Sequence, residues 1–251
     1  MIRTVAMLTF WSLALIPVAL FFIPWSFLVG NVDLMYRMFM WGTAAGVRLV
    51  GVWTRVIGLD KLDPNRTYVF MSNHVSNLDP AITVPLLPRR TSVLIKRELF
   101  NIPILGKAMR MGSMVPVDRG DRDAGIAAVK FASEVVRQGV NMTIYVEGHR
   151  SFDGKLIPFK KGPFYLAEGC KVPVVPITIV GTHYIMPKGR FAIKPGVADV
   201  IFHAPIEPKD FGTRDELMEK VRSMIEGGLP IEFQNPSTTK DTKVHEGTSR
   251  V

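Results

Sequence analysis

The chain of 251 residues is long enough for one core domain with an appendage, but too short for two full domains. Its hydrophobic share of 47% is high for a soluble protein, and its formal net charge of +9 favours partners that carry phosphate or carboxylate groups. The single cysteine, Cys170, excludes an internal disulfide and the usual cysteine-based zinc sites.

Residues 4–32 contain no ionisable side chain and are dense in Leu, Ile, Phe and Trp. About 29 residues at about 1.5 Å each exceed the roughly 30 Å hydrocarbon core of a bilayer, so the segment is long enough to span it. Pro17 and Pro24 permit either a bent span or a helix that dips into the bilayer and turns back. A cleaved signal peptide fits less well, because the apolar run is overlong and no A-x-A-like cleavage site ends it.

A second apolar segment, residues 34–57, is predicted to be helical, and it is interrupted by Arg37, Arg48 and Arg55. At about 100° per residue, the three arginines fall within about 20° of one another. They therefore form one basic stripe on an otherwise apolar helix, which suits a membrane interface where guanidinium groups meet anionic headgroups.

In this interpretation Trp41 and Trp53 serve as interfacial anchors. A core helix that covers the globular domain is the alternative, and both descriptions can hold for different faces of the helix. Residues 1–58 are thus predicted to be membrane-associating helices. The basic residues that follow the first segment place the rest of the chain on the cytoplasmic face of the cell membrane.

Residues 59–233 have the texture of an α/β domain, in which short apolar runs alternate with helical patterns. The predicted strands are residues 68–71, 92–95, 113–117, 142–146, 174–180 and 198–203. The predicted helices are residues 121–137, 162–169 and 214–225. This alternation predicts a mainly parallel or mixed central sheet flanked by helices. Residues 234–251 are polar with little to bury and are predicted to be disordered.

Polar side chains follow the first four predicted strands, in the order His74, Lys96, Arg119 and Glu147. In a sheet of this kind, residues at the carboxyl ends of the strands gather in one crevice. His74 and Asp79 lie five residues apart, and an imidazole oriented by a carboxylate is suited to accepting a proton near pH 7. Chance alone supplies such a spacing in many chains, so the position of the pair after a strand is what supports a catalytic role. An Asp that caps a loop beside an ordinary His is the alternative.

Four blocks of sequence carry a resemblance to a known family. They are Asn73-His74 with Asp79, Gly112 through Asp118-Arg119, Glu147-Gly148-His149-Arg150, and Val172-Pro173-Val174-Val175-Pro176-Ile177. In order and spacing the blocks resemble those of the lysophosphatidic acid acyltransferase (1-acylglycerol-3-phosphate O-acyltransferase) family of glycerolipid acyltransferases, over about residues 59–228. The third block departs from the usual Glu-Gly-Thr-Arg, because His149 replaces the Thr, and this departure leaves the exact acceptor open.

The resemblance implies transfer of an acyl chain from acyl-CoA or acyl carrier protein to the sn-2 hydroxyl of 1-acylglycerol-3-phosphate, which gives phosphatidic acid. These thioesters are co-substrates, and no cofactor or metal is implied. His74 would remove the proton from the attacking hydroxyl while Asp79 holds the imidazole, without a covalent enzyme intermediate. Membrane lipids and the lysophospholipid acceptor are the expected partners.

The resemblance also implies a set of substrate-binding residues: Arg119, Glu147, Gly148, Arg150 and Lys96. Arg119 would bind the acceptor's phosphate, because a guanidinium offers a planar fork of donors and keeps its charge; a surface salt bridge is its alternative. Glu147 and Arg150 would bind the glycerol portion and order the pocket, and Gly148 would permit a tight turn. Lys96 would add positive charge for the phosphate, a role that Arg97 could fill instead.

Other functions remain open on the sequence alone. The same chemistry could act on glycerol 3-phosphate or a lyso-aminolipid, and the scaffold could be a non-catalytic lipid-binding protein. A nucleic-acid binder fits worst, because the apolar amino terminus has no role there. Ser76 as a nucleophile lacks the G-x-S-x-G turn, and a zinc site of His74, Asp79 and Glu147 lacks a helical H-E-x-x-H spacing. Lys155, Lys160 and Lys161 could meet coenzyme A phosphates or an acidic carrier protein, or could form a solvated loop.

Overall fold

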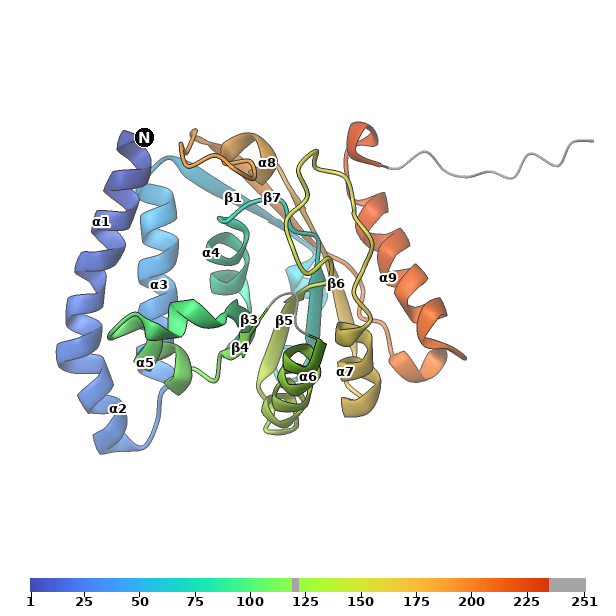
Figure 1. The fold of residues 1–251 in the computed structure, drawn as a ribbon, viewed down its shortest axis with the longest axis horizontal. Coiled ribbons are helices and arrows are strands. Elements are labelled where there is room, and N and C mark those ends of the chain that lie inside the picture. Colours follow the sequence, from blue (N-terminus) through green and yellow to red (C-terminus); the bar gives the residue numbers. More distant parts are fainter. Residues whose placement is uncertain (119–121, 235–251) are drawn as a thin grey trace, which may run out of the picture.

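The computed structural model describes residues 1–118 and 122–234, and in them a seven-stranded sheet forms the centre of the protein (Figure 1). The strands are β1 Val52–Ile57, β2 Val69–Ser72, β3 Thr91–Lys96, β4 Val115–Val117, β5 Asn141–Tyr145, β6 Val174–Val180 and β7 Gly196–Phe202. Their spatial order is β1-β7-β6-β2-β5-β3-β4. Strands β6, β2, β5, β3 and β4 are parallel neighbours, whereas β7 runs antiparallel to β6 and pairs with β1 in parallel. The predicted mixed sheet flanked by helices is confirmed.

The helices that flank the sheet are α4 Asp79–Thr83, α5 Leu105–Met111, α6 Arg122–Arg137, α7 Gly162–Cys170, α8 Thr182–Ile185 and α9 Arg214–Gly227. Short 3₁₀ turns occupy Leu59–Lys61, Val84–Leu86, Arg97–Asn101, Pro208–Asp210 and Ile231–Phe233. The six predicted strands correspond to β2 to β7, and the three predicted helices to α6, α7 and α9, all with ends within two residues. The polar tail predicted for residues 234–251 lies, apart from its first residue, outside the described residues.

The amino-terminal apolar segment is one continuous helical stretch, Ile2–Val29, that is long and apolar enough to cross a membrane. It comprises α1 Ile2–Pro17, a π-helical turn Val18–Phe22 and α2 Ile23–Val29. The π turn lies between Pro17 and Pro24, where prolines remove backbone donors and the helix widens to accommodate them. Gly30, in the left-handed region with φ of +66°, ends the helix.

The next helix, α3 Asp33–Leu49, runs back beside α1 and lies between α1 and the rest of the protein (Figure 1). Trp11 of α1 donates its indole N–H to the carbonyl of Thr43 at 3.2 Å. The close approach depends on Gly46, where a Cβ would lie 2.2 Å from the Trp11 indole nitrogen. The two helices therefore pack face to face along most of their length.

The prediction of one helix over residues 34–57 is wrong beyond Leu49. Gly51, with φ of +80°, turns the chain, and Val52–Ile57 forms the edge strand β1 against β7. The β-branched residues of this run favour a strand once a partner is present. Arg55 consequently leaves the predicted basic stripe and pairs with Asp199 of β7, so that Arg37 and Arg48 remain on the helix.

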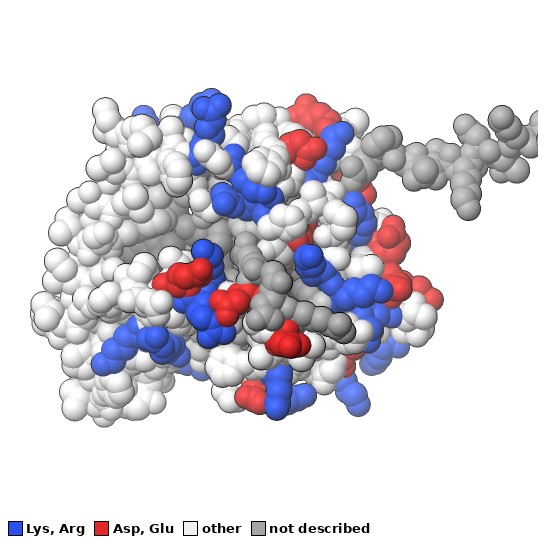
Figure 2. All heavy atoms as spheres, in the orientation of Figure 1, with Lys and Arg blue, Asp and Glu red and all other residues white. Residues whose placement is uncertain are grey.

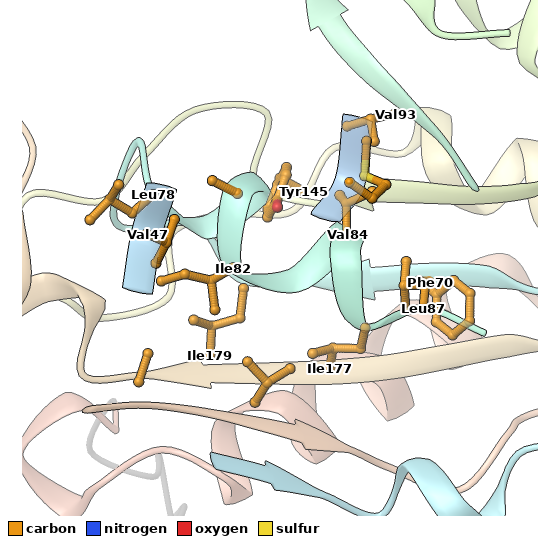
Figure 3. Packing of buried hydrophobic residues seen from close by; sticks show 14 of the residues in the cluster. Val47, Phe70, Leu78, Ile82, Val84, Leu87, Val93, Tyr145, Ile177 and Ile179 are labelled. Atoms are coloured by element: carbon orange, nitrogen blue, oxygen red, sulfur yellow. The ribbon is translucent and has the colours of Figure 1, made fainter. Parts of the chain in front are cut away.

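Two apolar layers cover the two faces of the sheet. On one face, side chains of α3 and α4 pack on the strands, and Figure 3 shows Val47 and Ile82 above Ile177 and Ile179 of β6. On the other face, buried side chains of α6, α7 and α9 form the second layer. Neighbouring side chains of the parallel strands point into both layers, and this explains their nearly continuous apolar character.

Candidate active site

His74 lies in the loop that leads from the carboxyl end of β2 to α4, and Asp79 is the first residue of that short helix. The Nδ1 atom of His74 lies 2.7 Å from Oδ2 of Asp79, and both side chains are buried. The same carboxylate oxygen accepts the backbone N–H groups of Val75 and Ser76, each at 2.8 Å. This contact assigns the proton to Nδ1 and leaves Nε2 as the ring nitrogen for an incoming hydroxyl.

Tyr145, the last residue of β5, lies against the face of the His74 ring. The ring centroids are 4.2 Å apart, with an interplanar angle of 26°. Burial, together with the charge of Asp79, raises the pKa of Tyr145 well above its ordinary value, so the phenol stays neutral. Tyr145 thus packs against the face of the imidazole ring, and the hydrogen bond to Asp79 fixes the rotation of the ring.

Asn73, the residue before His74, anchors the loop to the neighbouring strand β6. Its Nδ2 donates to the carbonyl of Ile179 at 2.9 Å, and its Oδ1 accepts the N–H of Ile179 at 2.8 Å. The side chain therefore forms the pair of hydrogen bonds that a strand residue would make, at the point where β2 has ended.

Glu147 lies just beyond β5 and is fully buried. Its Oε1 accepts the backbone N–H of His74 at 2.7 Å, and its Oε2 accepts the backbone N–H of Ile157 at 2.9 Å. Burial, with a smaller contribution from the charge of Asp79, raises the pKa of Glu147 to about 7, although the two backbone hydrogen bonds act to lower it. Glu147 therefore ties the His74 loop to the segment that follows β5.

The turn after Glu147 depends on Gly148, whose φ is +73° and where a Cβ would lie 3.1 Å from Cγ of Lys160. His149 is exposed, and Arg150 is half-buried with its carbonyl accepting a hydrogen bond from Lys188 Nζ at 2.8 Å. The backbone N–H of Ser151 donates to the carbonyl of His74 at 2.9 Å. The main chain of His74 is thus held by two hydrogen bonds, one to Glu147 in this block and one from Ser151 directly after it.

Lys96 lies at the carboxyl end of β3, on the same edge of the sheet as His74 but two strands away in the order β2-β5-β3. It is exposed and pairs with Glu98 at 2.9 Å, while Arg97 pairs with Asp118. The predicted phosphate-binding residue Arg119 lies outside the described residues, directly after Asp118. The structure brings together His74, Asp79, Glu147 and Gly148, and it places Lys96 on the rim of the same edge.

Ser76 has a structural position in the loop. Its Oγ donates to the carbonyl of Met186 at 2.8 Å and accepts the N–H of Leu78 at 3.1 Å. This geometry favours loop capping over a nucleophilic role. Within residues 1–118 and 122–234, no three His, Cys, Asp or Glu side chains gather closely enough to hold a metal ion.

Sequence reasoning did not assign roles to Asn73 and Tyr145. One signal was available for Tyr145, because it lies two residues before Glu147 and side chains two apart along a strand point the same way. The role of Asn73 depends on the neighbouring strand β6, whose position beside β2 is a property of the whole sheet.

Comparisons with known proteins identify the family to which this chain belongs. The profile described as Acyltransferase matches residues 54–180, about half of the chain. The chloroplastic 1-acyl-sn-glycerol-3-phosphate acyltransferase of Brassica napus is 40% identical over 175 residues, which are 68% of this chain and 49% of the relative. The alpha form from Mus musculus is 31% identical over 192 residues, which are 76% of this chain and 67% of the relative.

The crystal structure of the 1-acyl-sn-glycerophosphate (LPA) acyltransferase from Thermotoga maritima matches with a TM-score of 0.76 and 26% identity. The match covers 90% of this chain and 93% of that one. The chain spans about half the length of the Brassica relative and 58% of the 1-acyl-sn-glycerol-3-phosphate acyltransferase from Cocos nucifera, which is 29% identical over 70% of this chain. With the fold, the four blocks and the profile in agreement, this chain belongs to the acyltransferase family.

Proposed function

We propose that this protein transfers an acyl chain from acyl-CoA or acyl carrier protein to the sn-2 hydroxyl of 1-acylglycerol-3-phosphate, giving phosphatidic acid. The observation that carries the proposal is the buried His74–Asp79 pair at the carboxyl edge of the sheet, with Nε2 of His74 left for a substrate. The names of the relatives from Brassica napus and Mus musculus support this choice of substrate.

In the proposed reaction His74 is the general base. The acceptor hydroxyl donates to Nε2, and its proton moves to that nitrogen as the oxygen bonds to the thioester carbonyl carbon. The carbon–sulfur bond of the tetrahedral intermediate then breaks, and the departing thiolate takes the proton from the imidazolium. Asp79 stabilises the imidazolium in between, as the carboxylate of a His–Asp pair does elsewhere.

The contacts of Glu147 support a positioning role within the pocket. Both of its carboxylate oxygens accept backbone N–H groups inside the protein, one of them from His74 itself. In this proposal Glu147 orders the pocket by fixing the main chain of the base, and Gly148 allows the turn that brings Arg150 to the rim. Arg119 and Lys96 supply positive charge for the acceptor's phosphate.

The apolar amino terminus indicates membrane association, and its packing supports attachment in the plane of the bilayer surface. Figure 2 shows an outer surface over α1 and α2 that is almost free of charged side chains. Helix α3 joins this apolar layer to the sheet along most of the length of α1 (Figure 1). If α1 and α2 crossed the bilayer perpendicular to its surface, charged parts of the domain would enter the hydrocarbon. We place the domain on the cytoplasmic face of the membrane, because basic residues follow the apolar segment.

A different acceptor is the second candidate, and His149 is the observation that favours it. This residue is exposed in the turn after Glu147, at the position where the motif that this block resembles usually has Thr. Glycerol 3-phosphate and lyso-aminolipids are the acceptors that retain the same hydroxyl chemistry.

The proposal is tested by mass spectrometry of the products that the purified chain forms in detergent. A panel of 1-acylglycerol-3-phosphate, glycerol 3-phosphate and lyso-aminolipids is offered with acyl-CoA and, in parallel, with acyl carrier protein. We expect phosphatidic acid to be the main product and a free thiol to appear in equal amount. Preferential acylation of another acceptor would select the second candidate, and absence of thioester consumption would indicate a lipid-binding protein without catalysis.

A further inference from the structure

A basic cleft lies at the opposite edge of the sheet from His74. It has a volume of about 580 Å³ and is bounded by α3 and by the loops that precede β3 and β5. Four arginines line it: Arg37, Arg48, Arg89 and Arg90. Among the described residues that line the cleft, Asp33 is the single acidic one. Because Arg90 precedes β3 whereas His74 follows β2, this cleft is separate from the candidate active site.

The positive charge of the cleft is poorly neutralised and partly fixed in place. Arg89 donates to two neutral carbonyls, those of Asn65 at 2.8 Å and Gly139 at 2.9 Å. Arg90 is 3.8 Å from Asp33, the outer limit of an ion pair. Throughout residues 1–118 and 122–234, the guanidinium groups of Arg37 and Arg48 have no hydrogen-bond or ion-pair partner, and both residues are exposed. The cleft therefore has positive charge available to bind an anion.

The contribution of α3 to the cleft combines cationic and amphipathic side chains. Arg37, Trp41 and Arg48 fall within about 40° of one another on the helix, at about 100° per residue. Trp41 is 65% exposed, and its indole ring is a typical side chain at the level of lipid headgroups. This face of the helix suits an anion that is attached to an apolar body.

The position of the cleft indicates that the anion belongs to a membrane lipid. A second hollow of about 410 Å³ shares Asp33 and Arg90 with it and extends to Gly30, where the apolar helix Ile2–Val29 ends. The helices α1 and α2 form the outer apolar layer. Side chains on the flank of α3 lie about one helix diameter, roughly 10 Å, from the outer surface of that layer toward the sheet. Since an apolar helix face sinks about 5–10 Å into the acyl boundary, those guanidinium groups lie at headgroup depth.

We propose that this cleft binds the phosphate of an anionic glycerophospholipid from the bilayer, and that this contact fixes how the protein lies on the membrane. The planar donors of Arg37 and Arg48 meet the phosphate from α3, and Arg89 and Arg90 meet it from the opposite wall. The site differs from the basic stripe predicted from sequence, because Arg55 is absent from it and two loop arginines complete it.

The test is flotation of the full chain with vesicles of phosphatidylcholine, with or without phosphatidylglycerol. The variant Arg37→Gln/Arg48→Gln should need about 30-fold more lipid for half-maximal binding to the anionic vesicles, at about 1 kcal/mol for each basic residue near the surface. Its binding to phosphatidylcholine alone should match the wild type. The matched control Lys209→Gln/Lys220→Gln removes two charges from exposed positions outside the cleft and should retain anionic binding.

A second variant is expected to bind more strongly than the wild type, a result that misfolding cannot produce. Asp33→Asn removes the acidic group of the wall and should strengthen binding to the anionic vesicles. Equal losses in the cleft and control variants, no loss in the cleft variant, or no gain in Asp33→Asn would overturn the proposal. Inorganic phosphate at constant ionic strength should leave flotation unchanged. Competition by phosphate would assign the cleft to a soluble anion instead.

Discussion

The backbone N–H of His74 donates to Oε1 of Glu147 at 2.7 Å, while the ring of His74 is held by Asp79 at the same distance. Two carboxylates therefore hold the same residue, one through its main chain and the other through its side chain. They differ in what they control, because Asp79 sets the tautomer of the imidazole and Glu147 sets the position of the loop that carries it.

Replacement of His74 by Ala tests the role of the base. We expect the rate of acyl transfer to fall by about 10²–10⁴-fold, the range that general-base catalysis contributes, because alanine has no atom that can accept the hydroxyl proton in place of Nε2. The assay follows thiol release with detergent-solubilised protein, and a thermal melt confirms that the variant is folded. A folded variant that transfers acyl chains near the wild-type rate would refute the mechanism.

Glu147 should leave a signature in the pH dependence of stability. Its pKa of about 7 in the folded protein lies above the ordinary 4.5, so between these pH values the folded chain holds a proton that the unfolded chain has released. The stabilisation from Glu147 is present below about pH 4.5 and is lost as the pH rises through about 7, a change of about 3 kcal/mol.

Glu147→Gln removes this titration. The free energy of unfolding of the wild type relative to the variant should therefore decrease from about pH 4.5 to 7. Denaturant midpoints across this window measure the difference, and Glu219→Gln on α9 is the surface control. A difference that is constant with pH would show that burial does not raise the pKa of Glu147 as described.

Tyr145 should act through the orientation of the His74 ring. Tyr145→Phe keeps the stacked ring, and we expect its kcat to stay within about threefold of the wild type. Tyr145→Leu removes the stacking surface, and a misplaced base can lower kcat by about 10²-fold while the KM for the acceptor stays unchanged. Steady-state kinetics separates the two constants. Equal losses in both variants would assign the effect to the hydroxyl group rather than to the ring.

Arg119 is predicted from sequence to bind the acceptor's phosphate. A hydrogen bond to a charged group contributes about 1.5–3 kcal/mol, so Arg119→Ala should raise the KM for the lysophospholipid by about 10–150-fold. Arg119→Lys keeps the charge without the planar fork and should give an intermediate KM. If the dependence of rate on lysophospholipid concentration is unchanged in Arg119→Ala, this residue does not bind the phosphate.

The sheet was largely predictable because its parallel strands are buried on both faces and so read as short apolar runs between helical patterns. Strand β1 was not, since Val52–Ile57 follows an apolar helix without a polar break and becomes a strand through pairing with residues 196–201. The His74–Asp79 contact was predictable because the two residues are only five positions apart, one in the loop after β2 and the other at the start of α4. The contacts of Asn73 with Ile179 and of Glu147 with Ile157 were not, because they require knowledge of which strands and loops are neighbours.

The hydrogen bonds between Asn73 and Ile179 join residues that are 106 positions apart in the chain. During synthesis on the ribosome, the His74 loop therefore lacks its anchor until β6 has emerged. By then the apolar helix Ile2–Val29 has long been available to the membrane. An incomplete nascent chain would accordingly reach the lipid surface before the His74 loop is anchored. Under the proposed function, the protein would therefore gain activity only where its lipid acceptor resides.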